Sequence, residues 1–235
     1  MHPTVIGAKA VAWVSAILLG CACSARAADA GAFEKLTGEV TVIGADNTPR
    51  SVQENAAIRA GDKVATGAKG EALIKMADDS TVVLRPNTQF EVRGFRYDKS
   101  ADDHILFALL RGTARLISGL VAHARHSSVG ITAGTATIGI RGTDFEVAVI
   151  PEDLPQARAG VYDYVHSGGT TITIASGNSL DVNEDQTAFA PDKPKPGEAP
   201  LQLLGEPPLF LQQGGGFDGL LQSLTAQPMN VFRFR

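Results

Sequence analysis

Hydrophobic residues along this chain fall in short runs rich in valine, isoleucine and threonine, separated by clusters of glycine, aspartate, asparagine and proline. Within several runs apolar and polar residues alternate, as at Phe90 and Val92 and at Phe145 and Val147, which places the apolar side chains on one strand face. Runs of about four to seven residues between turns are typical of an all-β domain. The pattern predicts such a domain over 38–190, with strands at 38–43, 64–66, 71–76, 81–85, 89–93, 105–110, 112–117, 136–140, 143–150, 161–166, 170–175 and 179–182.

The segment 104–118 allows two interpretations. Its leucines are spaced as in a helix, but Gly112 interrupts the run and the residues after it alternate. We therefore predict two strands there, at 105–110 and 112–117. The following segment, 119–128, has little strand signal, and it is predicted to be a loop or a short helix.

The composition changes after Ala190. Six prolines fall within 191–208, and because proline fixes φ and removes a backbone donor, a central strand is excluded there. We predict an extended Pro/Gly-rich linker over 191–216. The remaining tail, 217–235, has leucines at helical spacing. It is predicted to be a flexible tail or a short helix, with docking onto the domain as the alternative.

The first 27 residues are typical of a signal peptide, because a lysine-bearing start is followed by an apolar run that is short for a membrane span. Ala25 and Ala27 form a cleavage site of the A-x-A type. Alternatively, Cys21 ends a sequence that resembles a bacterial lipobox and would become a lipidated first residue. Either route predicts a protein that does not span the membrane after processing. It would be periplasmic or secreted, or an outer-membrane lipoprotein.

Charge and cysteine content narrow the classes of function. The chain carries a formal net charge of −4, and without Lys9 and Arg26 of the leader 19 basic residues stand against 25 acidic ones. An acidic body without a basic run argues against nucleic-acid binding. Both cysteines, Cys21 and Cys23, lie in the leader, so cleavage after Ala27 leaves no disulfide and the core must stabilise the domain.

Candidate chemistry is sparse. His123 and His126 are three residues apart and His104 follows two aspartates, but nothing in the sequence makes three or four metal ligands converge. Motifs for a nucleophile or a phosphate-binding loop are absent from the sequence. Tyr162 and Tyr164 share one face of a predicted strand, where packing is favoured over a sugar-binding platform. We predict a protein that is not an enzyme and has no cofactor, metal or catalytic residue.

Glycine and short polar residues mark the boundaries between the predicted strands. Glycine suits a chain reversal or a close backbone approach, and a neighbouring aspartate can bond the amides of the turn. Arg141 is expected to cap carbonyl groups or to pair with an acid. The residues singled out in this way, all with expected structural roles, are Gly61, Asp62, Gly67, Gly112, Gly139, Arg141, Gly142, Thr143, Asp144 and Phe145.

The run 138–147 (IGIRGTDFEV) resembles the segment that closes the core of FecR-type domains, the extracytoplasmic module named for the ferric-citrate regulator. Further landmarks precede it in the order expected for the family, and together they cover roughly 38–149: GEV at 38–40, GDKVATG at 61–67, GEALI at 70–74, DS at 79–80 with LRPNT at 84–88, LRGT at 110–113 and ITA at 131–133. The resemblance implies an all-β, solenoid-like or sandwich-like fold. Classical sensors of this family place a cytoplasmic segment and a membrane span before the module, whereas here it follows the leader almost directly, so the stand-alone exported form is expected.

These observations predict an exported, non-enzymatic recognition or signalling module that docks a protein of the bacterial cell envelope. Docking could use strand addition at an exposed sheet edge. The alternative is a structural or adhesive envelope lipoprotein anchored at Cys21.

Overall fold

A computed structural model describes residues 29–212 and 214–218. The predicted leader with Cys21 and the part of the predicted tail beyond 218 lie outside these residues. Within the described part, no helix has both the length and the apolar character needed to cross a membrane.

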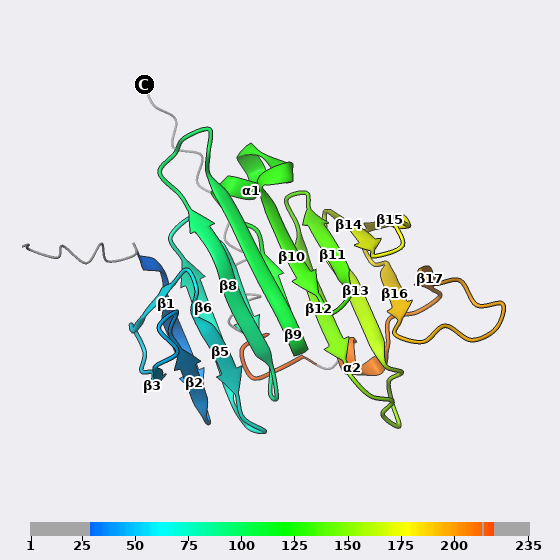
Figure 1. Cartoon of the computed structure of the whole chain (residues 1–235), viewed down its shortest axis with the longest axis horizontal. Helices are drawn as coiled ribbons and strands as arrows, with labels where there is room; N and C mark the ends of the chain where they lie inside the picture. The colour runs from blue at the N-terminus through cyan, green and yellow to red at the C-terminus, as the bar shows by residue number, and fades with distance from the viewer. Residues whose placement is uncertain (1–28, 213, 219–235) are drawn as a thin grey trace, which may run out of the picture.

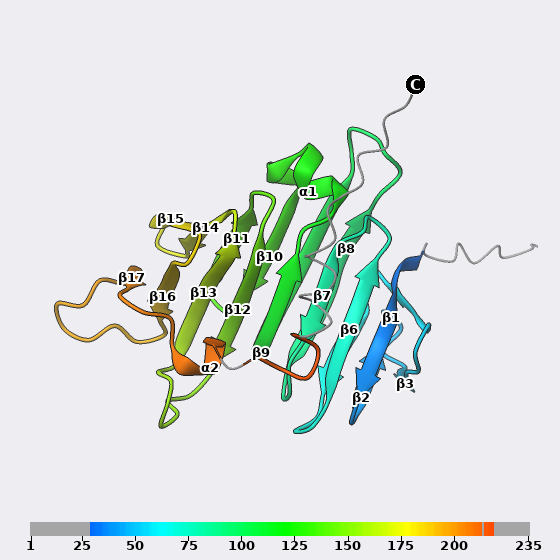
Figure 2. The ribbon, with the colours of Figure 1, turned by 180° about the vertical axis from the view of Figure 1, so that it is seen from behind.

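The chain forms two packed β-sheets that share one strand, and Figures 1 and 2 show them from opposite sides. The described residues contain 17 strands. Sheet A runs in the order β4 (Ala57–Arg59), β1 (Asp29–Thr37), β6 (Glu71–Met76), β7 (Thr81–Leu84), β9 (His104–Ile117), β12 (Asp144–Ile150), β13 (Gly160–Ser167), β16 (Thr187–Pro191) and β17 (Gln202–Leu204). Sheet B runs β3 (Pro49–Ser51), β2 (Val40–Ile43), β5 (Lys63–Thr66), β8 (Gln89–Arg96), β9, β10 (Val129–Ala133), β11 (Ala136–Ile140), β14 (Gly169–Ile174) and β15 (Ser179–Asn183). The all-β prediction is confirmed, and the arrangement is the sandwich-like one.

Strand β9 corrects the prediction of two separate strands at 105–110 and 112–117. Its first half pairs with β8 and β10 in sheet B, and its second half pairs with β7 and β12 in sheet A. Gly112 lies at the crossing with φ +86°, and a Cβ there would lie 2.5 Å from the Thr88 Cα. The glycine thus lets the strand change sheets without ending, which is why it interrupts the hydrophobic run.

One hydrophobic core fills the space between the sheets. Phe33, Phe145 and Val147 enter it from sheet A, while Phe90 and Ile131 enter it from sheet B, and each is at most 1% exposed. The alternating apolar and polar residues used for the prediction therefore point alternately into the core and to the outer face of a sheet. Burial of these side chains is the main favourable contribution to stability, because the described chain has no disulfide.

Several elements were not predicted. β1 has the sequence DAGAFEKLT, whose small and charged residues conceal its strand character, yet it pairs with both β4 and β6. The short strands β3, β4 and β10 and the C-terminal β16 were also missed as strands. The segment 119–128 holds a short helix, α1 (Leu120–Ala124), and a 3-10 turn, His126–Ser128, in agreement with one of its two interpretations.

The range expected to be an extended linker, 191–216, contains ordered elements. β17 adds to β16 as an edge strand, and a short helix, α2 (Leu209–Gln212), follows it. An edge strand needs hydrogen bonds on one side only, so the surrounding prolines do not prevent it. The chain then returns across sheet A, as the orange segment of Figure 2 shows.

Candidate docking site

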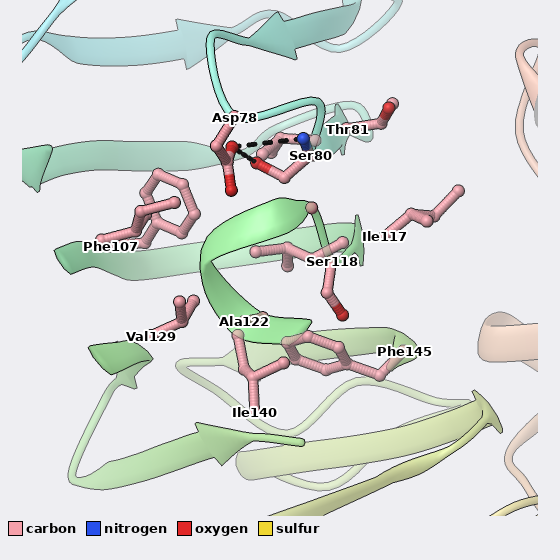
Figure 3. Close-up of a pocket in the computed structure, with 14 residues that line it drawn as sticks. Asp78, Ser80, Thr81, Phe107, Ile117, Ser118, Ala122, Val129, Ile140 and Phe145 are labelled. Atoms are coloured by element: carbon pink, nitrogen blue, oxygen red, sulfur yellow. Dashed lines mark hydrogen bonds between the residues drawn. The ribbon is translucent and has the colours of Figure 1, made fainter. Parts of the chain in front are cut away.

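The cavity between the sheets is too small to be a ligand site. It lies under α1 and is lined mainly by apolar side chains such as Phe107, Ile140 and Phe145, with Asp78 and Ser80 at one side (Figure 3). Asp78 accepts hydrogen bonds from the Ser80 amide and hydroxyl. The cavity volume of about 10 Å³ is around the least that holds one water molecule. This region therefore belongs to the core.

The outer face of sheet A carries a cluster of charged side chains. Strand register aligns Val83 of β7, Arg115 of β9 and Glu146 of β12 in one row across the face. Because β12 alternates, Phe145 and Val147 enter the core while Glu146 points outward. Arg85 follows β7 directly, and its backbone amide donates to the Thr113 carbonyl of β9. Its guanidinium joins the cluster.

The two arginines of this cluster hold carboxylates at close range. Arg115 binds Asp144 with two parallel hydrogen bonds of 2.8 Å and 2.7 Å. Arg85 Nε donates to Glu146 Oε1 at 3.1 Å. The Arg85 and Glu146 side chains are only 9% and 5% exposed, so these pairs are shielded from water. Such paired, charge-assisted bonds are strong, and losing one partner leaves a buried charge.

Residues 214–218, which we call the strap, cover this cluster. Arg85 Nη2 donates to Asp218 Oδ1 at 2.6 Å, and Arg115 Nη1 lies 3.7 Å from the same oxygen. The Gly216 amide donates to Glu71 Oε1 at 3.2 Å. The strap therefore binds the charged cluster through both a side chain and the backbone.

Apolar contacts hold both ends of the returning chain. Phe217 packs against Leu73, Val83 and Ile117 on strands β6, β7 and β9. Leu211 of α2 packs with Tyr162 and other residues of β12, β13 and β16. The returning chain thus contacts strands on both sides of β9.

The carboxylates of the cluster raise the pKa of its arginines. Burial lowers the pKa of Arg85, but Glu146 and Asp218 outweigh this effect and raise it above its ordinary value. In Arg115, burial also lowers the pKa, and Asp144 is the main cause of a net rise. Arg85 Nη1 and Glu71 Oε2 are buried and have no hydrogen-bond partner among the residues that the structure describes.

Aromatic packing covers the other end of the same face. Tyr162 stacks on Phe189 with a centroid distance of 4.4 Å and meets the edge of Phe210 at 5.2 Å. Its hydroxyl donates to the Arg158 carbonyl at 3.0 Å. Tyr162 thus packs within the sheet, as predicted.

The structure places the residues singled out in the sequence at three separate locations. Gly61, Asp62 and Gly67 flank β5, and Asp62 accepts hydrogen bonds from Arg50 at 2.5 Å and from the Arg59 amide at 2.9 Å. Gly112 marks the crossing in β9. The remaining residues, Gly139, Arg141, Gly142, Thr143, Asp144 and Phe145, lie along β11, β12 and their connection.

Within the third group, the side chains differ in role. Arg141 donates to the Thr170 carbonyl at 3.2 Å and lies 3.5 Å from Asp181, while Thr143 donates to the Gly169 carbonyl at 2.6 Å. Phe145 is fully buried in the core. Of all the residues singled out, only Asp144 joins the charged cluster.

The histidines considered as metal ligands do not form a cluster. His104 Nδ1 lies 2.8 Å from the Asp102 carbonyl oxygen, and His123 lies on α1 beside Gly142. In the part of the chain that the structure describes, no three His, Cys, Asp or Glu side chains are close enough together to hold a metal ion.

Sequence reasoning missed the residues that dominate the site, namely Glu71, Arg85, Arg115, Glu146 and Asp218. A signal was available for some of them. Arg85 lies inside the LRPNT landmark, and Arg115 and Glu146 alternate with core residues in predicted strands. Their convergence depends on strand register and on the strap, which contacts Glu71, Arg85 and Arg115.

Comparison with known proteins identifies the central part of the chain. Residues 62–178 match the family model described as "FecR protein". No curated protein matches the chain.

Solved structures show more distant likenesses. Two crystal structures of a protein from Parabacteroides distasonis ATCC 8503, provisionally assigned as an anti-sigma factor, are each 12% identical to this chain, with TM-scores of 0.47 and 0.46. The match covers 61% of this chain and 59% of the other. A structure described as a cell surface anchoring domain is 29% identical over 26% of this chain and 82% of its own, with a TM-score of 0.26.

Proposed function

Because residues 62–178 are a FecR domain, we propose that the protein is an exported, non-enzymatic signalling module that recognises a protein partner in the cell envelope. We place the docking surface on the outer face of sheet A, at the charged cluster under the strap. The observation that carries this proposal is the Asp218 carboxylate held between Arg85 and Arg115. A sheet face that already binds a peptide segment in this way is suited to bind another.

The contact between strap and sheet has the composition of a protein interface. A buried aromatic side chain, Phe217, lies beside arginines that form charge-assisted bonds, and both residue types are enriched where proteins bind one another. The strap would then regulate docking, because a partner must displace it to reach the cluster.

Export and anchoring are part of the same proposal. The leader sequence supports transport to the periplasm or beyond, with cleavage after Ala27 or lipidation at Cys21. Labelled fatty acid incorporation that disappears in Cys21→Ser would favour the lipoprotein route. Absence of labelling in the wild-type protein would favour plain cleavage.

Photo-crosslinking in living cells tests the docking surface. A photoreactive phenylalanine analogue replaces Tyr164, which lies on the outer face of sheet A next to Glu146. The matched control replaces Thr137, which is exposed on the outer face of sheet B. Both are measured in the wild-type background and with Phe217→Ala and Asp218→Asn combined, which releases the strap.

The expected result is an envelope protein crosslinked from position 164, more strongly when the strap is released, and not from position 137. Equal crosslinking from both faces, or no dependence on the strap, would overturn the choice of surface. Capture only of other copies of the chain or of cell wall would favour a structural or adhesive function.

A further inference from the structure

The strap makes three contacts that each set a chemical requirement, and these requirements define what else can bind in its place. The first is the carboxylate. Asp218 Oδ1 accepts a hydrogen bond from Arg85 and lies near Arg115. Two guanidinium groups around one oxygen favour an anion, and a neutral amide at this position cannot form the same ion pair.

The second requirement is an aromatic side chain directly before the carboxylate. Phe217 is 6% exposed and packs against Leu73 and Val83, which are themselves 1% and 0% exposed. A smaller side chain would leave this apolar surface uncovered.

The third requirement is glycine two positions before the aromatic residue. A Cβ on Gly215 would lie 2.7 Å from Glu71 Oε1 and would collide with the guanidinium of Arg85, which cannot move aside without losing its bonds to Glu146 and Asp218. The Asp218 amide donates to the Gly215 carbonyl at 3.2 Å, so residues 215–218 form a tight turn. The turn brings the backbone close to the charged cluster.

We propose that the strap site binds, in trans, a turn-forming partner segment of the type Gly-x-Phe-Asp, with an aromatic residue followed directly by a carboxylate. This inference rests on the proposed docking face and names the chemistry of its partner. The strap is then an internal copy of the recognised segment. A partner would bind when it competes successfully with that copy.

A free partner segment has to compete with the strap, which is covalently attached next to its site. A segment tethered to its site has an effective concentration that can reach the millimolar range. A free peptide should therefore bind weakly to the wild-type protein and much more tightly once the strap is released. This dependence distinguishes the strap site from unspecific peptide binding elsewhere.

The test uses the full chain and a fluorescent peptide, Gly-Gly-Gly-Phe-Asp-Gly, which copies residues 214–219. Fluorescence polarisation measures its Kd for the wild type and for the Phe217→Ala and Asp218→Asn double variant. We expect the double variant to bind at least about tenfold more tightly. Thermal unfolding followed by circular dichroism verifies that the double variant folds.

Variant peptides test each requirement without changing the protein. Asparagine in place of aspartate should weaken binding about ten- to a hundredfold, the range for loss of a hydrogen bond to a charged group. Alanine in place of phenylalanine, or of the glycine equivalent to Gly215, should also weaken binding at least about tenfold. A peptide of the same composition in scrambled order is the control.

Equal binding of the aspartate and asparagine peptides, or of the matched and scrambled peptides, would overturn the inference. If the double variant does not fold, hydrogen exchange at the Gly216 amide of the wild type replaces it, and a saturating peptide should accelerate that exchange. Strap-dependent crosslinks from position 164 without peptide selectivity would leave the docking face standing and remove only this inference.

Discussion

The Asp218 carboxylate lies 2.6 Å from the Arg85 guanidinium, although 133 residues separate them in the sequence. Arg85 follows a strand of the N-terminal half of the domain, whereas Asp218 reaches it after the chain has completed both sheets. This contact holds the returning chain on the outer face of sheet A, beside the ion pair of Arg85 and Glu146.

Replacing Asp218 with alanine should destabilise the protein and loosen the strap. The change removes a hydrogen bond to a charged group, so the free energy of unfolding should fall by about 1.5 to 3 kcal/mol. Urea unfolding measures this difference. The exposed Glu184→Ala serves as a control of the same charge change, and an equal loss in both variants would contradict a specific role for Asp218.

Gly142→Ala should destabilise the domain, whereas Gly139→Ala, three residues earlier, should have little effect. Gly142 has φ +72°, and a Cβ there would lie 3.2 Å from His123 Nδ1. Gly139 lies within β11, and its Cβ would meet nothing closer than 3.8 Å. A left-handed conformation costs a non-glycine residue roughly 1 kcal/mol or more.

The bulkier Gly142→Val should lower stability further, by at least about 1 to 3 kcal/mol in total. Melting temperatures of the three variants give the comparison. An unchanged melting temperature for Gly142→Val would be inconsistent with the positive φ at this position.

Stability should depend on pH through Asp163, which is buried between the sheets. Burial raises the pKa of Asp163 to about 7 from an ordinary 3.8, although a hydrogen bond from Thr170 partly opposes the rise. Between these two pH values the folded protein keeps the proton that the unfolded chain loses. The free energy of unfolding should therefore fall as pH rises from about 4 to 7, by at most about 1.4 kcal/mol per pH unit.

Asp163→Asn tests this, because asparagine keeps an oxygen to accept the Thr170 hydrogen bond and has no charge to bury. Unfolding in urea at several pH values should show that the stability difference between variant and wild type grows across this window and is constant above it. Parallel curves for the two proteins would contradict ionisation of Asp163 in the folded state.

Thr66→Val should destabilise the fold beside the charged cluster. The Thr66 hydroxyl donates to the Arg85 carbonyl at 2.6 Å and accepts from the Thr88 amide at 2.9 Å. Valine has nearly the same shape but satisfies neither group, at a cost of about 1 to 3 kcal/mol. Thr41→Val, on the outer face of sheet B, is the control, and denaturant unfolding compares them.

Strand positions were largely predictable because alternation with a buried core is a local property of the sequence. Val64, Phe90, Val147 and Ile172 all lie in predicted strands and all point into the core. β1 escaped prediction because its pairing with β6, rather than its own residues, makes it a strand. A strand can thus be predicted from the sequence where its side chains alternate. It cannot be predicted where only its pairing partners make the segment a strand.

The charged cluster could not be predicted for a different reason. Arg85, Arg115 and Glu146 lie on an outer face, where a sequence pattern implies contact with water. The returning chain contacts both arginines through Asp218, and the register of β7, β9 and β12 brings Arg115 and Glu146 side by side. The sequence contained the family landmark around Arg85, but no local pattern links it to Asp218.

Strand β9 also determines how the molecule carries mechanical load. Within the described residues, no strand from β1 to β8 pairs with any strand from β10 to β17, so every ladder between the two halves passes through β9. A force pulling the halves apart would act on this one strand and on the hydrophobic core that the two halves share. The strap contacts β6, β7 and β9 and takes part in neither ladder, so a partner that displaced it would leave this connection between the halves intact.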